Sequence, residues 1–321
     1  MAGDARRLIL DTDGGVDDAQ ALLLLVGAGR VPDAITTVFG NVALDAATDN
    51  VLATLAVAGV EVPVHAGAAD PLAADRIHAH GVHGEDGLAG APRPARTGRA
   101  ASRDAVGFLV ETFTSAAAAG ERVDLLTIGP LTNLALALRR APGIAAGIGA
   151  LTLMGGTLHG RGNVTPAAEF NIYADPEAAA VVFAADLATT VVPWETCVAH
   201  RIDGSDIDRL LGPVPDGPRR RFVDALLRNE RERHLRQGLG DVLLFIDPLA
   251  AAVAIEPGIV ERSLRASVDV ALAPGLARGM TVIDPSGRVG TPPVTLLEAA
   301  RADRLAALFA ASLRAGLAGP A

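Results

Sequence analysis

The strongest constraint on this chain is a short acidic segment near its beginning. Residues 11–18 read Asp-Thr-Asp-Gly-Gly-Val-Asp-Asp and directly follow the apolar run Leu8–Leu10. A second apolar run, from Ala19 to Val26, comes next and has a length typical of a helix. The pattern predicts a buried strand that ends in a carboxylate-rich turn, and the turn opens a helix.

The four carboxylates of this turn repel one another unless some are protonated or a cation lies among them. The turn has no Cys or His, and an all-oxygen ligand set suits Ca²⁺ or Mg²⁺ better than Zn²⁺. Asp is also common at helix starts, so Asp17 and Asp18 could simply complement the helix dipole. Asp11 and Asp13 lie at the carboxyl end of the strand, where open α/β sheets bind their ligands. We therefore predict a functional site at this turn.

The composition excludes other classes of function. The chain has 321 residues, is 50% hydrophobic and carries a net charge of -9. Because it has no basic stripe, we expect no nucleic-acid partner. No apolar stretch is long enough for a signal peptide or a membrane span, so we expect no membrane association. A single cysteine, Cys197, cannot form an internal disulfide, and a cytoplasmic location is expected.

Apolar runs of strand length alternate with helix-like segments along the chain. We expect strands at about 34–39, 62–65, 123–128, 148–154 and 189–192, and helices at about 43–58, 105–119 and 294–313. This alternation is typical of a parallel sheet. We predict one domain over residues 1–321, a doubly wound α/β fold with helices on both faces of a mostly parallel sheet. The charged residues 218–237 are expected to form a solvated helix with ion pairs.

The acidic turn resembles a family signature. It is similar to the Asp-x-Asp-Pro-Gly-x-Asp-Asp motif of calcium-dependent nucleoside N-ribohydrolases of the inosine-uridine-preferring type, with Gly14 where Pro is usual. Further segments similar to that family are residues 83–88, 129–133, 154–156, 162–178, 245–250 and 275–281. The resemblance implies a nucleoside hydrolase with a nucleoside as its small-molecule substrate. It also implies a homodimer or homotetramer.

The resemblance further implies a metal site and a mechanism. Ca²⁺ would be held by Asp13, Asp18, Asp247 and the main-chain carbonyl of Ile128. Asp13 would remove a proton from a Ca²⁺-bound water, which attacks the anomeric carbon and releases ribose and the free base. A carbonyl ligand does not depend on its side chain, so an apolar residue at position 128 is compatible with the site. Asp247 also precedes Pro248 at an expected helix start, where it could serve as a cap.

Candidate sugar-binding residues follow the expected strand at 148–154. Asn163, Glu169 and Asn171 place two amides and a carboxylate in a short polar loop. Such a set suits the hydroxyls of a sugar, and the resemblance implies that this loop binds ribose. Asp17 and Asn41 are expected to hold the same sugar.

Other candidates have competing interpretations. The resemblance implies that Met154 lies against the ribose, although a lone Met is more often part of a core. His78, His80 and His83 could suggest zinc, but no Cys or acidic partner completes a tetrahedral set. Residues 83–88 resemble a His-Gly-x-x-Gly-Leu segment that borders the substrate pocket in the family, and this resemblance implies a flap that brings His83 to the pocket. Trp194 could stack on a base, but a lone Trp after a strand is more often core or rim.

The most important difference from the family pattern lies at the residue that would assist the leaving base. Ile246 lies where many members of the family have a His that is thought to help the departing base. His234, in the charged segment, is a candidate for contact with the leaving group and a possible replacement donor. A non-catalytic, calcium-dependent protein that binds ribose or nucleosides is the alternative, because a sensor needs no such donor. The sequence does not name the preferred base.

Overall fold

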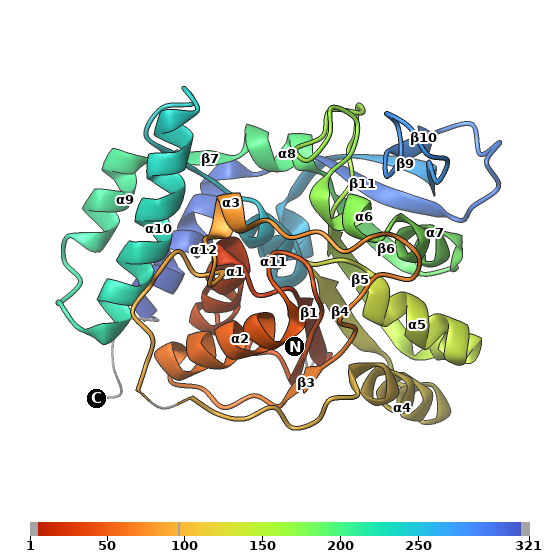
Figure 1. Ribbon diagram of the computed structural model, residues 1–321, viewed down its shortest axis with the longest axis horizontal. Helices are drawn as coiled ribbons and strands as arrows, with labels where there is room; N and C mark the ends of the chain where they lie inside the picture. The colour runs from red at the N-terminus through yellow and green to blue at the C-terminus, as the bar shows by residue number, and fades with distance from the viewer. Residues whose placement is uncertain (1–5, 96, 316–321) are drawn as a thin grey trace.

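A nine-stranded sheet forms the centre of the protein, with the strand order β10-β9-β11-β6-β5-β4-β1-β2-β3 (Figure 1). The computed structural model describes residues 6–95 and 97–315. The strands are β1 Leu8–Thr12, β2 Ala34–Thr37, β3 Val64–Ala66, β4 Val123–Thr127, β5 Ile148–Met154, β6 Ala188–Val192, β9 Val260–Val270, β10 Thr281–Asp284 and β11 Pro293–Ala300. Neighbouring strands from β3 across to β11 are parallel. Among the described strands of this sheet, the antiparallel pairs are β9 with β11 and β9 with β10. The predicted mostly parallel sheet is confirmed.

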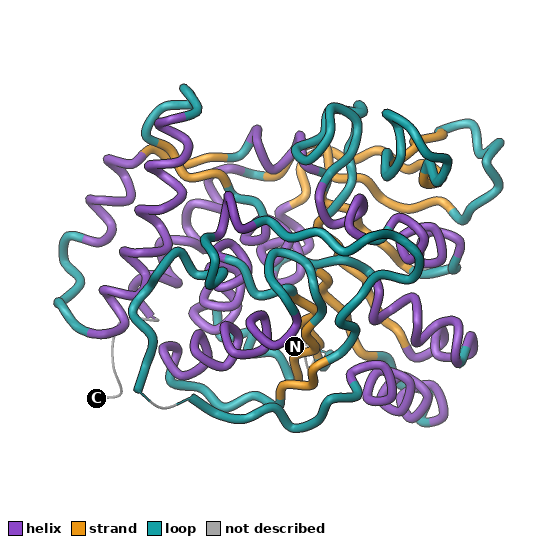
Figure 2. Tube along the Cα trace, in the orientation of Figure 1, coloured by secondary structure: helices purple, strands orange, loops and turns teal. Residues whose placement is uncertain are grey.

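The helices lie around this sheet (Figure 2). They are α1 Val16–Gly27, α2 Leu44–Ala58, α3 His80–His83, α4 Ala105–Ala118, α5 Thr132–Arg140, α6 Phe170–Ala174, α7 Pro176–Ala184, α8 Trp194–Ala199, α9 Gly204–Leu211, α10 Pro218–Arg236, α11 Asp247–Ile255 and α12 Ala302–Ala315. Two 3₁₀ turns, η1 Pro142–Gly147 and η2 Pro257–Ile259, and a separate strand pair, β7 Arg201–Asp203 with β8 Val242–Leu244, complete the described elements.

The core consists of two main apolar clusters on opposite faces of the sheet. Leu8 and Leu10 of β1 belong to one cluster and Ile9 to the other, because successive side chains of a strand point to opposite faces. Residues of α1, α11 and α12 join the first cluster, whereas residues of α4, α5 and α7 join the second. Burial on both faces explains why β1 and β4 are apolar runs rather than alternating patterns.

The order of the strands creates the crevice that positions the site. From β1, the chain adds β2 and β3 on one side of the sheet, and then β4, β5 and β6 on the other. The connection that follows β1 therefore runs toward one edge of the sheet, and the connection that follows β4 runs toward the other edge. In open α/β sheets, ligands bind at the point where the connections change direction, outside the carboxyl ends of the strands. The acidic turn after β1 lies at this point.

The expected closing helix over residues 294–313 was wrong in its first half. Residues 293–300 form β11, which lies between β6 and β9 in the sheet, and α12 begins only at Ala302. The segment Val294–Leu297 contains apolar and β-branched residues that pair with both neighbouring strands. Long-range pairing of this kind overrides a helix-like local pattern.

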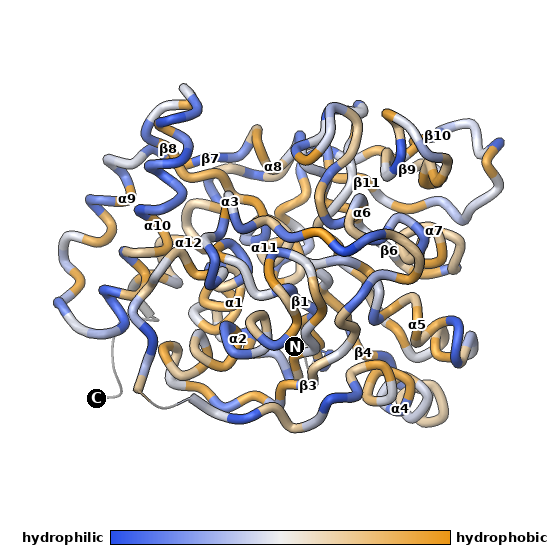
Figure 3. Tube along the Cα trace, viewed as in Figure 1, coloured by the Kyte–Doolittle hydropathy of each residue, from blue (hydrophilic) through white to orange (hydrophobic). Residues whose placement is uncertain are grey.

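Helix α10 is charged but not simply solvated. Hydrophilic residues cover much of it (Figure 3). Yet Phe222, Leu226, Glu230 and His234 are buried along one side, because these positions recur at every fourth residue and face the rest of the protein. The expectation of a solvated helix therefore holds only for its outer face.

Within the described ranges, none of the helices is long and apolar enough to cross a membrane. The expected single domain covers residues 1–321, of which residues 1–5, 96 and 316–321 lie outside the described part. It stays a prediction.

Candidate active site

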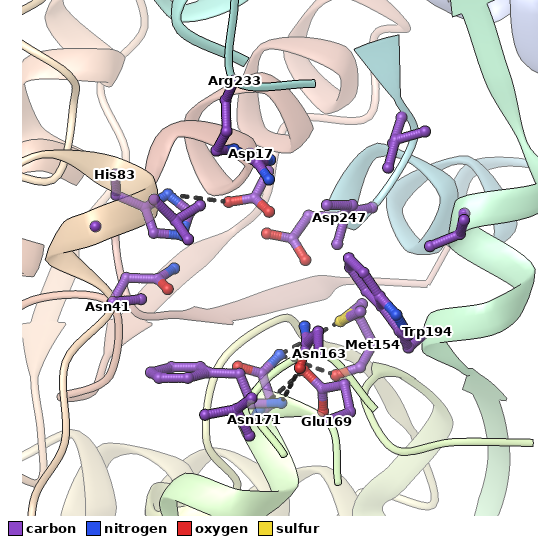
Figure 4. Close-up of a pocket in the computed structure, with 18 of the residues that line it drawn as sticks. Asp17, Asn41, His83, Met154, Asn163, Glu169, Asn171, Trp194, Arg233 and Asp247 are labelled. Carbon is purple, nitrogen blue, oxygen red and sulfur yellow. Dashed lines mark hydrogen bonds and ion pairs between the residues drawn. The ribbon is translucent and has the colours of Figure 1, made fainter. Parts of the chain in front are cut away.

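A cavity of about 550 Å³ opens at the carboxyl ends of the central strands. Side chains from several elements converge on it (Figure 4). The predicted site residues that line it are Asp17, Asn41, His83, Ile128, Met154, Asn163, Glu169, Asn171, His234 and Asp247. The other two predicted residues, Asp13 and Asp18, are buried and hydrogen-bonded to Asn41 of the lining. The fold thus brings together residues that lie more than two hundred positions apart in the chain.

The acidic turn has the strand-to-helix form that its sequence predicts. Gly14 has a φ of +69°, and a Cβ there would lie 2.7 Å from the main chain of Ala47. Proline cannot adopt this φ, so the turn requires glycine where the family signature has Pro. At the start of α1, the main-chain N–H of Gly15 donates to Oδ2 of Asp18 at 2.8 Å. Thr12 donates its hydroxyl to Oδ1 of the same carboxylate. Asp18 is thereby held in place.

Three buried carboxylates form a compact group that could hold a cation. Oxygens of Asp17, Asp18 and Asp247 lie within 4.8 Å of one another. Oδ1 of Asp17 is buried without a hydrogen-bond partner, and no described residue donates a hydrogen bond to Asp247. Burial, followed by the charge of neighbouring carboxylates, raises the pKa of Asp18 and raises that of Asp247 well above its ordinary value. An all-oxygen group of this kind fits a hard divalent cation, which would remove the repulsion.

Asp13 lies next to this group but is held differently. Asn41 donates its main-chain N–H to Oδ2 of Asp13 at 2.7 Å and its side-chain Nδ2 to Oδ1 at 3.0 Å. Burial, together with the charge of Asp18, raises the pKa of Asp13 well above its ordinary value. The compact group therefore contains Asp17, and Asp13, which the sequence analysis expects as a ligand, lies beside it and is oriented by Asn41.

The opposite wall of the cavity carries the polar loop before α6. Glu169 caps α6, since its carboxylate accepts the main-chain N–H groups of Gly156 at 2.8 Å and Asn171 at 2.9 Å. Burial raises the pKa of Glu169 to about 7, although these hydrogen bonds oppose the shift. Glu169 is therefore a structural residue of the loop as well as a lining residue.

The two loop amides keep groups available for a ligand. Asn171 donates through Nδ2 to the carbonyls of Ile128 and Met154, both at 3.2 Å, which leaves its Oδ1 as an acceptor. Asn163 accepts the main-chain N–H of Phe170 at 2.9 Å through Oδ1, which leaves its Nδ2 as a donor. An acceptor and a donor side by side suit the hydroxyls of a sugar.

Two histidines in the lining have defined proton positions. Nδ1 of His83 accepts the main-chain N–H of Val16 at 3.1 Å, so the neutral ring carries its proton on Nε2. Burial lowers the pKa of His83 to about 4. Nδ1 of His234 instead donates to the carbonyl of Val242 at 2.9 Å, and its buried Nε2 has no partner. Neutral His234 therefore has a lone pair on Nε2, which is the wrong form for a proton donor.

The structure narrows the roles that Trp194 can have. Trp194, at the start of α8, lines the cavity and is partly buried, so it belongs to the rim rather than to the core alone.

His78 donates through Nδ1 to the carbonyl of Gly40 at 2.9 Å and stacks on His80. In the described part of the chain, neither of these two histidines joins a group of metal-ligating side chains. The structure therefore does not support a zinc site.

The sequence analysis missed a polar cluster beneath the cavity. Arg233 lines the cavity and pairs with Glu230 at 3.5 Å, and Gln20 of α1 donates to Glu230 at 2.9 Å. The charge pattern of residues 218–237 predicts a solvated helix, so Arg233 and Glu230 are not among the predicted site residues. A usable signal was present, because Glu230 continues the every-fourth-residue line of the apolar Phe222 and Leu226.

The comparisons with known proteins agree with this geometry. The sequence profile of the inosine-uridine preferring nucleoside hydrolases matches residues 8–307. Uridine nucleosidase 1 of Arabidopsis thaliana is 36% identical over 267 residues, which cover 81% of this chain and 76% of the relative. The pyrimidine-specific ribonucleoside hydrolase RihB of Escherichia coli (strain SE11) is 34% identical over 302 residues and covers 91% of each chain.

Solved structures are similar over nearly the whole chain. A plant nucleoside hydrolase, PpNRh1, has a TM-score of 0.88 and 30% identity, with 97% of this chain and 99% of the other covered. An inosine-guanosine nucleoside hydrolase has a TM-score of 0.86 and 28% identity, with the same coverage. The similarity in sequence and in fold thus extends over nearly the whole chain.

Proposed function

Because this chain belongs to the inosine-uridine preferring nucleoside hydrolase family, we propose that the cavity beside the acidic turn is its active site. The protein is an enzyme that hydrolyses the N-glycosidic bond of ribonucleosides to ribose and free base. One observation supports this site above all. Buried carboxylates, among them Asp17 and Asp247, face the loop amides Asn163 and Asn171 across a single cavity.

The proposed cofactor is Ca²⁺. The resemblance implies Asp13, Asp18, Asp247 and the carbonyl of Ile128 as its ligands, and Asp17 belongs to the same acidic group. Oδ1 of Asp17 has no hydrogen-bond partner and lies 3.7 Å from Nδ1 of His83. This oxygen and the all-oxygen donor set fit a hard divalent cation. When bound, such an ion supplies positive charge that offsets the carboxylates and lowers the pKa of a water molecule in the site.

We propose Asp13 as the general base. Asn41 orients its carboxylate, and a carboxylate held within reach of a water molecule can accept the proton of that water. A water that gives its proton to Asp13 attacks the anomeric carbon, while the bond to the base nitrogen breaks and its electron pair goes to the base. Positive charge gathers on the sugar ring as this bond lengthens, and the acidic wall of the cavity stabilises that charge.

The substrate sugar would be held from two sides. Asn163 and Asn171 offer a donor and an acceptor from the loop, and Asp17 and Asn41 lie on the other wall. Met154, next to Asn171, supplies an apolar surface for the ribose. These contacts fix the anomeric carbon near the proposed base, and correct positioning of this kind contributes much of an enzyme's rate.

The first experiment measures ribose release from uridine, inosine, cytidine, adenosine and guanosine with a reducing-sugar assay. We expect saturable release, and we begin with uridine because the curated relatives described above act on uridine or pyrimidine nucleosides. Binding of these nucleosides without ribose release would contradict hydrolysis and favour a non-catalytic nucleoside-binding protein.

Replacing Glu169 by alanine should affect both stability and substrate binding. Loss of a helix cap costs about 0.5–2 kcal/mol, and displacement of Asn171 should raise KM more than it lowers kcat. The matched control is Asp104→Ala, which removes the cap of α4 that accepts the N–H of Gly107. Thermal melting should show a loss for both variants, whereas KM should rise only for Glu169→Ala. An unchanged KM in Glu169→Ala would remove this loop from the sugar site.

We also propose that the protein is located in the cytoplasm. We further propose that it assembles as a homodimer or a homotetramer. The single buried Cys197 suits a reducing compartment, and the oligomer follows from the family resemblance. Light scattering of the purified protein would give the mass of the assembly, and a monomer at micromolar concentration would contradict this part.

A further inference from the structure

The leaving base needs a proton or a positive charge, and the cavity offers few groups that supply either. Ile246, in the lining, is apolar. Neutral His234 presents a lone pair, and burial, followed by the charge of Arg233, lowers its pKa although the hydrogen bond to Val242 opposes the shift. His83 accepts a hydrogen bond at Nδ1 and so keeps only the weakly acidic N–H of a neutral ring. None of these three residues is a strong donor in its observed state.

Arg233 is the only residue with a permanent positive charge in the described lining of the cavity. Its side chain is only 14% exposed, and its Nε is buried without a hydrogen-bond partner. Its single ion pair among the described residues is the 3.5 Å contact with Glu230, which is too long for a strong hydrogen bond. The guanidinium therefore has N–H groups available for another partner.

The position of Arg233 corresponds to the base end of a bound nucleoside. Figure 4 shows Arg233 on the opposite side of Asp17 and Asp247 from Asn163 and Asn171. If the loop amides and the acidic wall hold the ribose, the base extends away from that loop. The lining of the cavity also includes the apolar residues Leu239, Leu244 and Ile246, and apolar side chains suit the faces of a planar ring.

We propose that Arg233 stabilises the leaving base as an anion, so that its departure needs no general acid. This inference rests on the proposed function of the cavity. The bond between the anomeric carbon and the base nitrogen breaks, and its electron pair stays on the base, where the guanidinium N–H groups pair with the negative charge. The proton of the attacking water goes to Asp13, which then releases it to the solvent, and the released base takes a proton from the solvent. Water and nucleoside thus yield ribose and neutral base.

A purely structural role for Arg233 makes a different prediction. If Arg233 only offsets the buried charge of Glu230 and the acidic group, its loss should slow every substrate to a similar degree. If it stabilises the leaving group, its loss should matter most for a poor leaving group. The comparison of two leaving groups on the same sugar therefore separates the two roles.

The test compares uridine with p-nitrophenyl riboside, whose leaving group departs readily as an anion. Arg233→Met removes the charge and keeps most of the length of the side chain. We expect kcat/KM to fall about 10²–10³-fold for uridine, the effect of removing one preorganised donor, and less than about tenfold for the activated riboside. Equal slowing of both substrates, or of neither, would overturn the proposal.

The matched control is Arg236→Met, three residues further along α10. That side chain is 67% exposed and pairs with Glu232 at 3.8 Å, and we expect unchanged kinetics with both substrates. Added guanidinium ion, far below denaturing concentration, should restore part of the uridine rate of Arg233→Met and leave Arg236→Met unaffected. Absence of rescue together with equal slowing would leave Arg233 a structural residue.

A second variant keeps the test decisive if Arg233→Met does not fold. Arg233→Lys retains a charge but loses the planar fork, so we expect a smaller loss that is again larger for uridine than for the activated riboside. Equal losses in this variant would also overturn the proposal. Failure of the wild-type protein to release ribose from either substrate would instead contradict the proposed function, which keeps the two failures distinct.

Discussion

Replacing Asp13 by alanine is expected to lower kcat by several orders of magnitude. General base catalysis alone contributes roughly 10²–10⁴ in rate, and the same carboxylate is a proposed ligand of Ca²⁺. Asp13 is fully buried, and both of its oxygens accept N–H groups of Asn41. No other described residue can replace a carboxylate held in this way. Steady-state ribose release from the preferred nucleoside measures the effect.

Asp13→Asn separates loss of the base from loss of packing. The amide has the same size but cannot take up a proton, so its activity should be as low as that of the alanine variant. Asp45→Asn is the control, because Asp45 is a 75%-exposed residue of α2 that pairs with Arg103, and its activity should remain unchanged. Retention of more than about a tenth of wild-type activity in Asp13→Asn would exclude Asp13 as the base.

The stability of Asp13→Asn also has an expected sign. The pKa of Asp13 in the folded protein is raised above its ordinary value of 3.8, mainly by burial and then by the charge of Asp18. The folded state therefore binds this proton more tightly than the unfolded state, and stability falls as pH rises above the ordinary value. Without metal and at neutral pH, Asp13→Asn should melt at a temperature equal to or above that of the wild type.

Removal of the metal is expected to abolish hydrolysis and lower thermal stability. The oxygens of Asp17, Asp18 and Asp247 lie within 4.8 Å of one another in a buried site, and their repulsion is relieved only by protons or a cation. A ligand present at about 100 times its dissociation constant stabilises the folded state by about 2.7 kcal/mol. We therefore expect a melting temperature several degrees lower in excess chelator, with activity and stability both restored by Ca²⁺.

The pH dependence of this effect follows from the raised pKa values of Asp18 and Asp247. Protons compete with the cation for the same oxygens, so the affinity for Ca²⁺ should increase as pH rises. Calorimetry at two pH values measures this change, and parallel additions of Mg²⁺ and Zn²⁺ identify the preferred ion. Full activity after prolonged dialysis against chelator would contradict the metal assignment.

The acidic turn shows how much of the site can be predicted from the sequence. A buried strand, a tight turn and a helix start are local features, and each depends on residues within a few positions of one another. The carboxylates and Gly14 lie within this segment, so their chemistry and their place at the end of a strand were readable from residues 8–26. The polar residues Asn163, Glu169 and Asn171 also lie within one short loop, and the resemblance implies their role in binding the sugar, which stays a prediction.

Only the tertiary structure decided which distant groups meet in the cavity. Asp247 lies more than two hundred residues from Asp17, and the sheet order brings their oxygens together. The proton position on His234 depends on the carbonyl of Val242. Arg233 and Glu230 belong to a segment whose composition predicts a solvated helix, yet the packing of α10 turns both toward the protein interior.

Some features were predictable from the sequence and others only from the tertiary structure, because the interactions that form them act over different distances along the chain. Backbone preferences, caps and hydrophobic period act over a few residues, so the sequence by itself determined the strands β1 to β6, several of the helices and the acidic turn. Strand pairing and burial act between segments that are distant in the chain, and they assigned residues 293–300 to β11 rather than to a helix. The same long-range burial determined which face of α10 contributes a charge to the cavity, because a helix buries the side that packs against its neighbours.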